Sequence, residues 1–306
     1  MASGRATVGA DRVVFMRARK RERAPMAYSS TQDHDALGGN LVRRVAVLAM
    51  VGVLSGLMSG LFGIGGGTII VPALVWLGLT QRHAVATSLA AIIPTAIAGV
   101  ISYAQSGHVD WIAALLLACG TIVGAQLGSW LLSRLPEMVL RWAFAAFLVF
   151  VIVSQIVGTP SRDGTIHMTF LTGALLMLLG IFVGTLSGLL GIGGGAIVVP
   201  ALSLAFGASD LVARGTSLLM MIPNAITGSV ANVRRGLVNL RDGLIIGVVA
   251  ACLTSVGAWI AGSISARLGA NLFAVYLCVI GVRSIWAAIK VTPALADRLP
   301  HRKSGR

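Results

Sequence analysis

Two nearly identical stretches decide the fold of this 306-residue chain: SGLFGIGGGTIIVPAL at residues 59–74 and SGLLGIGGGAIVVPAL at residues 187–202. They lie 128 residues apart, and thirteen of their sixteen positions are identical. Downstream the spacing becomes 129 and then 133, and the similarity extends over about 110 residues of each half. Chance does not produce such a match, so the sequence predicts an internal duplication.

The composition is that of a membrane protein and excludes a soluble globular domain. Hydrophobic residues make up 56% of the chain and charged residues 11%, against about 25% charged residues in soluble domains. Lys and Arg total 24 against 10 Asp and Glu, but they lie between apolar runs and not in one patch. We therefore expect the lipid bilayer as a partner of this chain, and no nucleic acid.

Apolar segments of about 20 residues, the length of a helix that crosses a bilayer, recur along the chain. The sequence predicts eight such helices in two sets of four: Val45–Phe62, Ala84–Gln105, Trp111–Leu132, Met138–Val157, Met168–Leu190, Leu211–Val233, Gly243–Ile264 and Ala270–Ile289. Each set also contains a shorter apolar piece after its glycine cluster, Thr68–Leu79 or Ala196–Gly207. At 1.5 Å per residue such a piece is about 18 Å long, which is too short to cross the membrane.

The predicted fold is an all-α polytopic membrane protein built from two homologous repeats. We expect, in order, a basic disordered N-terminal tail (1–44), a first transmembrane repeat (45–157), a linker (158–167), a second repeat (168–290) and a basic C-terminal tail (291–306). If the chain turns back at each glycine cluster, six loop arginines lie in the cytoplasm and three lie outside. If it runs straight on across the membrane, four lie in the cytoplasm and five lie outside. Cytoplasmic loops carry an excess of Lys and Arg, so we predict inverted repeats with both termini cytoplasmic.

The glycine clusters are the predicted substrate-binding site. A run of glycines breaks a helix, and a break inside lipid bares N–H groups that need partners. The short helix that follows points its positive end at the break, which suits an anion, and paired interruptions mark the binding sites of secondary transporters. The predicted ligands in the two clusters are Gly63, Gly65, Gly66, Gly67, Thr68, Gly191, Gly193, Gly194, Gly195 and Ala196.

The glycine clusters have two alternative interpretations. Small residues commonly serve only to let membrane helices pack closely. A glycine-rich dinucleotide fingerprint is the other alternative, but the context lacks a preceding strand, an acidic ribose partner and a phosphate-binding lysine. The duplicated GIGGG followed by a short helix therefore favours the binding site.

Polar side chains of the following helices complete the predicted substrate site. They are Thr87, Ser88, Thr216 and Ser217 near the helix starts, and Asn224 after Pro223, whose counterpart is Thr95 after Pro94. Alternatively, these side chains form hydrogen bonds with the backbone of their own helix or with a neighbouring helix. Structural helix breaks are also predicted at Pro72, Pro94, Pro200 and Pro223. Arg82 and Arg214 either attract anions to the two entrances or only set the topology.

The sequence offers almost no side chains that are placed to carry out catalysis. The ten acids and five histidines lie in tails or between apolar segments, and Cys119, Cys252 and Cys278 stand singly. No metal cluster, nucleophile–base pair or carboxylate relay can be assembled from residues so placed. We expect no catalytic residues, no metal and no cofactor.

The two GxGGGxxxxPAL stretches with their following Thr-Ser pairs resemble the TauE/SafE family of sulfite and sulfonate exporters, a group of bacterial membrane permeases. The resemblance covers most of residues 45–290, while the basic tail before residue 41 lies outside it. It implies an all-helical bundle in the bacterial inner membrane. It also implies transport of a sulfur-containing anion such as sulfite, thiosulfate or an organosulfonate.

The resulting hypothesis is a secondary transporter that exports a small sulfur-containing anion by alternating access. An anion channel-like pore, or a permease for another small anion, would share the glycine breaks. A membrane scaffold without transport activity would need exposed partner-binding loops, whereas the loops here are mostly under about a dozen residues. That last alternative is the weakest.

Overall fold

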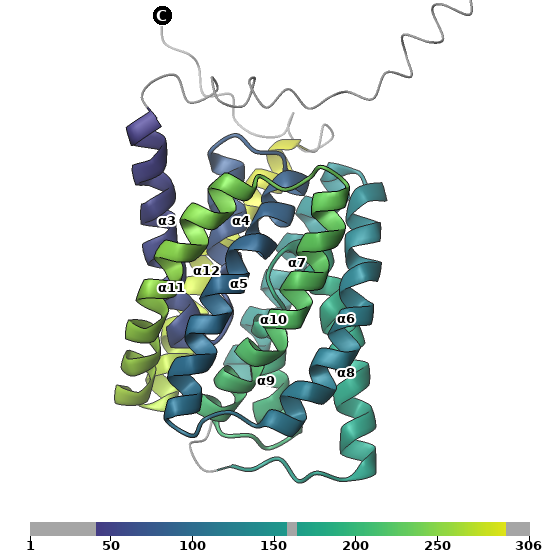
Figure 1. Cartoon of the computed structure of the whole chain (residues 1–306), viewed down its shortest axis with the longest axis vertical. Coiled ribbons are helices and arrows are strands. Elements are labelled where there is room, and N and C mark those ends of the chain that lie inside the picture. Colours follow the sequence, from purple (N-terminus) through teal and green to yellow (C-terminus); the bar gives the residue numbers. More distant parts are fainter. Residues whose placement is uncertain (1–40, 158–163, 292–306) are drawn as a thin grey trace, which may run out of the picture. The chain divides into compact units, whose positions relative to one another are not determined.

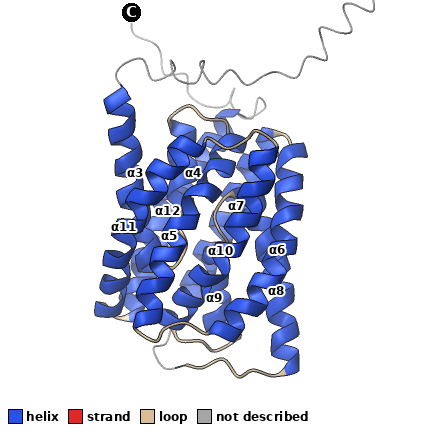
Figure 2. Ribbon diagram, in the orientation of Figure 1, coloured by secondary structure: helices blue, strands red, loops and turns tan. Residues whose placement is uncertain are grey.

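Ten helices and no strand make up the part of the chain that the structure, a computed structural model, describes, residues 41–157 and 164–291 (Figure 2). The prediction of an all-α fold with eight long and two short helices is confirmed. The predicted N-terminal tail as far as residue 40, six residues of the linker and the C-terminal tail from residue 292 lie outside the described residues. Residues 41–44, which the sequence assigned to the tail, are helical.

The two short helices each follow a glycine break and are α4 (Gly67–Trp76) and α9 (Gly195–Ala205). The eight long helices are α3 (Leu41–Phe62), α5 (Gln81–Gln105), α6 (Trp111–Arg134), α7 (Glu137–Val157), α8 (Phe170–Leu190), α10 (Asp210–Arg234), α11 (Leu240–Ser263) and α12 (Ala266–Val291). Of these, α3, α5, α6, α8 and α11 are long and apolar enough to cross a membrane.

The chain turns back at the first glycine break. Arg44, near the start of α3, pairs with Asp242 at the start of α11, with 2.6 Å between Nη2 and Oδ2. Thr87, near the start of α5, accepts a hydrogen bond from the N–H of Asn239 beside the same end of α11, at 3.0 Å. Helices α3 and α5 therefore begin at one end of the bundle, the upper end in Figure 1, and α4 leads the chain back to it.

The second half runs in the opposite direction. The N–H of Ser209 donates to the carbonyl of Gly164 at 3.2 Å, so α8 and α10 begin at a common end. The N–H of Asp110, between α5 and α6, donates to Thr216 near the start of α10, so this is the end where α5 finishes. The structure thus shows two halves of opposite orientation. Their origin from one duplicated unit stays a prediction from the sequence.

Two helix pairs approach closely through glycines spaced four residues apart. On α3, each of Gly52, Gly56 and Gly60 faces the backbone of α11, where an added β-carbon would collide. The same spacing recurs where α6 meets α8, at Gly120, Gly124, Gly128, Gly180, Gly184 and Gly188. Because lipid chains are as apolar as leucine, close packing of this kind is a main source of helix association in membranes.

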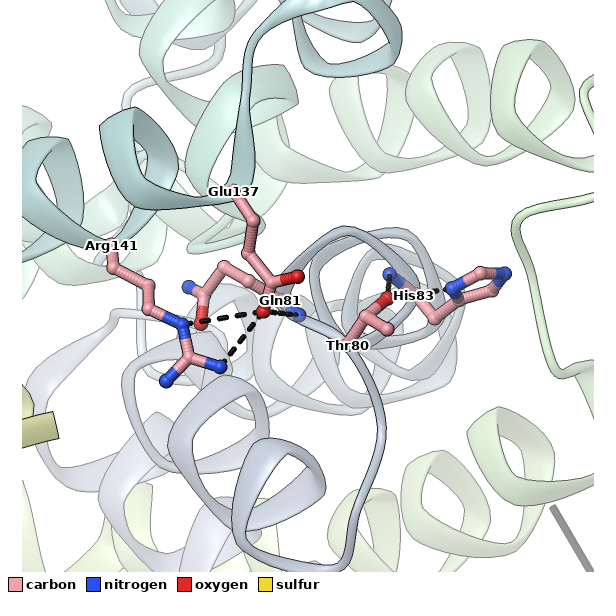
Figure 3. A network of polar contacts seen from close by, with 5 residues as sticks. All are labelled: Thr80, Gln81, His83, Glu137 and Arg141. Carbon is pink, nitrogen blue, oxygen red and sulfur yellow. Dashed lines mark hydrogen bonds and ion pairs between the residues drawn. The ribbon is translucent and has the colours of Figure 1, made fainter. Parts of the chain in front are cut away.

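A polar network joins the start of α5 to the start of α7 (Figure 3). Glu137 accepts a hydrogen bond from the N–H of Gln81 at 3.3 Å and pairs with Arg141 at 2.8 Å. Thr80 caps α5 by accepting from the N–H of His83 at 3.4 Å. Burial raises the pKa of the Glu137 carboxyl, but the hydrogen bonds from Arg141 and Gln81 outweigh it, so that this pKa lies below its ordinary value. The ionised carboxylate thereby fixes the connection from α4 to α5 against α7.

Two glycines of α11 predict opposite effects of the same substitution. At Gly257 an added β-carbon would lie 2.9 Å from Leu61 N and 3.0 Å from Gly60 Cα, whereas at Gly262 it would meet nothing within 4 Å. Overpacking costs about 1–3 kcal/mol, while Gly to Ala in an open helical position stabilises by about 0.5–1 kcal/mol. We expect Gly257→Ala to lower, and Gly262→Ala to raise, the thermal unfolding temperature of the purified protein in detergent. Equal temperatures for the two variants would contradict the proposed glycine contact between α11 and α3.

Candidate functional site

Both glycine breaks end in a short helix whose start has no side-chain cap. Helix α4 follows Gly66, with φ 74°, and α9 follows Gly194, with φ 93°. Both angles lie in the left-handed region that favours glycine. Within the described residues, the first-turn N–H groups of Thr68 and Ala196 have no hydrogen-bond partner. Each break therefore presents the positive end of a helix with at least one free donor.

The two breaks lie against each other inside the bundle. A β-carbon added at Gly67 would come within 2.7 Å of Ile192 Cα, and one at Gly195 within 2.8 Å of Ile64 Cα. Residues 59–68 and 187–200 are all buried. The structure thus brings the predicted ligands of the two halves together, and only glycine fits at these two contacts.

Two apolar side chains separate the innermost glycines of the breaks. Met221 places its terminal methyl against both Gly65 and Gly193. Ile92 packs beside the same two glycines, 3.3 Å and 3.1 Å from the positions where their β-carbons would stand. Ile92 and Met221 occupy equivalent positions of the two halves, 129 residues apart, and both are fully buried. In this conformation, the space between Gly65 and Gly193 is therefore lined by these apolar groups.

The predicted serine ligands hold the breaks together. Ser88 donates a hydrogen bond to the carbonyl of Gly191 in the opposite half. Ser217 makes the reciprocal bond to the carbonyl of Gly63, at 2.6 Å, and lies 2.8 Å from the carbonyl of Arg214. Because a hydroxyl has a single proton, neither serine has a donor left for an anion in this conformation.

The predicted threonine ligands hold the starts of two other helices. Thr216 accepts from the N–H of Asp110, the N-cap of α6, at 2.9 Å, and Thr87 accepts from the N–H of Asn239, the N-cap of α11, at 3.0 Å. Both threonines are fully buried. These bonds brace one half against the other and use only the acceptor capacity of the hydroxyls. Substrate binding by Thr87 and Thr216 stays a prediction.

Asn224 and Thr95, at equivalent positions, behave differently. The amide of Asn224 donates to Ser187 Oγ at 2.7 Å and to the carbonyl of Gly193 at 3.1 Å, so it spans the second break. Thr95 is shorter and donates to the carbonyl of Ala91 in its own helix at 2.9 Å. The second break is therefore bridged by a side chain that the first break lacks.

The prolines do not break helices, which corrects the prediction for Pro72, Pro94, Pro200 and Pro223. Each lies inside a continuous helix, respectively α4, α5, α9 and α10. A proline removes one N–H donor and disturbs one turn, and packed neighbours in a bundle can absorb that loss. The interruptions come from the glycines alone.

Arg82 and Arg214, for which the sequence allows either anion attraction or a topological role, have structural partners. Arg214 is buried, pairs with Asp210 at 3.0 Å and donates to the carbonyl of Leu61 at 2.6 Å. Arg82 donates to the carbonyl of Leu135 at 2.7 Å. Both guanidinium groups thus secure helix ends. Within the described residues, no group of three or more His, Cys, Asp or Glu side chains is placed to hold a metal ion.

Two serines that the sequence analysis did not single out lie at the first break. Ser55 and Ser59 are both fully buried, and within the described residues their hydroxyls have no hydrogen-bond partner. Ser55 Oγ occupies the space where a side chain at Gly66 would begin. Their spacing of four residues places both on one face of α3 just before the break, which is the signal that could have identified them.

Comparisons with known proteins point to one family. A family model described as "Sulfite exporter TauE/SafE" matches residues 34–297. A "Probable membrane transporter protein YunE" of Bacillus subtilis (strain 168) is 26% identical over 250 residues, which cover 74% of this chain and 89% of the relative. A "Probable membrane transporter protein" of Xylella fastidiosa (strain Temecula1) is 32% identical over 196 residues, covering 61% of this chain and 74% of the relative. No solved structure matches this chain.

The reciprocal serine bonds predict a stability loss when either hydroxyl is removed. Ser88→Ala or Ser217→Ala would leave a buried carbonyl of the opposite break unpaired, which costs about 1–3 kcal/mol. Ser263→Ala is the matched control, because Ser263 is exposed and bonds only the carbonyl of Trp259 in its own helix. We expect the first two variants to unfold at a lower temperature than the wild-type protein, and the third to unfold at the wild-type temperature. Three indistinguishable temperatures would refute the bracing role.

Proposed function

Because this chain belongs to the sulfite exporter TauE/SafE family, we propose that it is a secondary transporter that exports a small sulfur-containing anion such as sulfite, thiosulfate or an organosulfonate. The observation that carries this proposal is the meeting of two uncapped helix starts, α4 and α9, inside a bundle of membrane-length helices. The match to a probable membrane transporter protein over 89% of that relative's length supports assignment to the transporters.

The proposed substrate site uses backbone donors. The N–H groups at Gly65–Thr68 and Gly193–Ala196 belong to the two breaks, and each short helix adds a positive partial charge at its start. The described acids, Asp110, Glu137, Asp210 and Asp242, lie instead at or next to the starts of long helices. A carboxylate beside the breaks would repel an anion, so this distribution suits an anionic cargo.

Transport by alternating access requires the contacts between the breaks to open from each side in turn. Met221 and Ile92 fill the space between Gly65 and Gly193, and the breaks are buried, so this conformation is closed. Met221 has three rotatable bonds and can repack at low cost. In the proposed cycle, the two halves rock against each other. The hydrogen bonds that Ser88 and Ser217 donate form in the closed state and break in the open states.

We further propose the bacterial inner membrane as the location, with both termini in the cytoplasm. The end of the bundle where α3 begins carries Arg82, Arg141, Arg234, Arg235 and Arg241 in or beside its loops. Cytoplasmic loops are enriched in Arg and Lys, so this end is assigned to the cytoplasm.

Radioactive flux into proteoliposomes tests the proposed transport. We expect uptake of labelled sulfite or thiosulfate that saturates with concentration, and uptake that accelerates when the same unlabelled anion is loaded inside. Such counterflow requires a site that alternates between the two faces, whereas a channel-like pore gives unsaturable flux without acceleration. Liposomes without protein are the control. Saturable counterflow with chloride or another small anion alone would shift the function to the alternative permease.

A further inference from the structure

The two glycine breaks differ in polarity, and at three equivalent positions the difference bears on a ligand. Where the first half has Ser55 on its long helix, the second half has Val183. Where α4 begins with Thr68, α9 has Ala196. The third difference is Thr95 against Asn224. The first break therefore carries hydroxyls at three positions where the second carries a valine, an alanine and an amide.

At the second break the side-chain amide donors of Asn224 are already used, whereas within the described residues its buried Oδ1 acceptor has no hydrogen-bond partner. Asn224 bridges Ser187 and the carbonyl of Gly193, at 2.7 Å and 3.1 Å. Val183 packs against Gly194 at the start of α9, with its Cγ1 2.5 Å from the position where a β-carbon would stand. A ligand at the second break would have to displace both the amide bridge and the valine.

The first break has unused donors at the corresponding places. Ser55 and Ser59 are fully buried, and within the described residues neither hydroxyl has a partner. The hydroxyl of Ser55 lies against Gly66, the N-cap residue of α4, which has no side-chain cap. In the part of the chain that the structure describes, the first-turn N–H of Thr68 has no hydrogen-bond partner either. Leaving buried donors without partners is costly, so a site that keeps them in this arrangement favours a ligand that accepts from them.

The side chain of Thr68 is fixed beside this site. Its Oγ1 lies 2.7 Å from the hydroxyl of Tyr276 on α12. Tyr276 is held in turn by a stack of aromatic rings, with centroids 6.1 Å from Phe62 and 6.2 Å from Phe273. The start of α4 is thus anchored to α12, and its amides keep a fixed direction.

From this asymmetry we propose that the transported anion binds at the first break only, one anion per chain, with Ser55 and Ser59 as its side-chain ligands. The inference rests on the proposed function, narrows its substrate site from both breaks to the first, and names the side-chain ligands there. The shared chemistry of the substrates is a pyramidal or tetrahedral SO3 group, whose oxygens accept hydrogen bonds. The two hydroxyls and the first-turn amide at Thr68 supply three donors, and the positive end of α4 complements the charge.

The double variant Ser55→Ala/Ser59→Ala tests the assignment. The measurement is the thermal unfolding temperature of the full chain in detergent against sulfite, thiosulfate, sulfoacetate and taurine, with sulfate and chloride at matched ionic strength. A hydrogen bond to a charged group changes binding about tenfold or more, so we expect Kd to rise about 100-fold for the anion that stabilises the wild-type protein. Without ligand, the variant should unfold at or above the wild-type temperature, because it loses two buried hydroxyls that have no partner.

Ser187→Ala is the matched control at the second break. It removes one of the two hydrogen-bond acceptors of the Asn224 amide, so we expect a lower unfolding temperature with an unchanged Kd. Titration calorimetry of the wild-type protein should give one anion per chain. An unchanged Kd in the double variant, or a loss of binding in Ser187→Ala alone, would overturn the assignment to the first break. No stabilisation of the wild-type protein by any sulfur anion would instead overturn the proposed function, and this inference with it.

Discussion

The bared backbone of the two glycine breaks is the constraint on which the rest of this structure depends. Inside an apolar bundle, a carbonyl or N–H without a partner is costly, and no water is at hand to provide one. The carbonyls of Gly63 and Gly191 are paired by Ser217 and Ser88, each from the opposite half. Since each break is completed by the other half, the two halves pack against each other in opposite directions.

Glycine acts in a second way by bringing the long helices close enough to enclose the breaks. The contact of α3 with α11 and that of α6 with α8 both rest on glycines spaced four residues apart. These contacts join helices from different halves, as the serine bonds do. The carbonyls of Gly63, Gly191 and Gly193 accept hydrogen bonds from side chains, while within the described residues the first-turn N–H groups of Thr68 and Ala196 have no partner, and free donors of this kind suit an anion.

The sequence predicts the helices well, because apolar length and glycine runs act locally. The eight long helices and the two short ones follow from patterns within one segment, whereas the reversal at the breaks follows from the distribution of arginines over all the loops. The roles of Ser88 and Ser217 could not be predicted, because a hydroxyl that bonds a carbonyl 103 or 154 residues away looks like any helical serine. The predicted helix breaks at the prolines were wrong for the opposite reason. Proline does disturb an isolated helix, but packing against neighbouring helices in the bundle keeps these helices continuous.

Anomalous diffraction can show at which break the anion binds. Selenite presents the same pyramidal oxygens as sulfite, and anomalous diffraction from crystals grown with it would locate the selenium. We expect one peak per chain at the start of α4, within hydrogen-bonding reach of Ser55, Ser59 and the N–H of Thr68. A peak beside the loop arginines, or one equally strong at the start of α9, would contradict it.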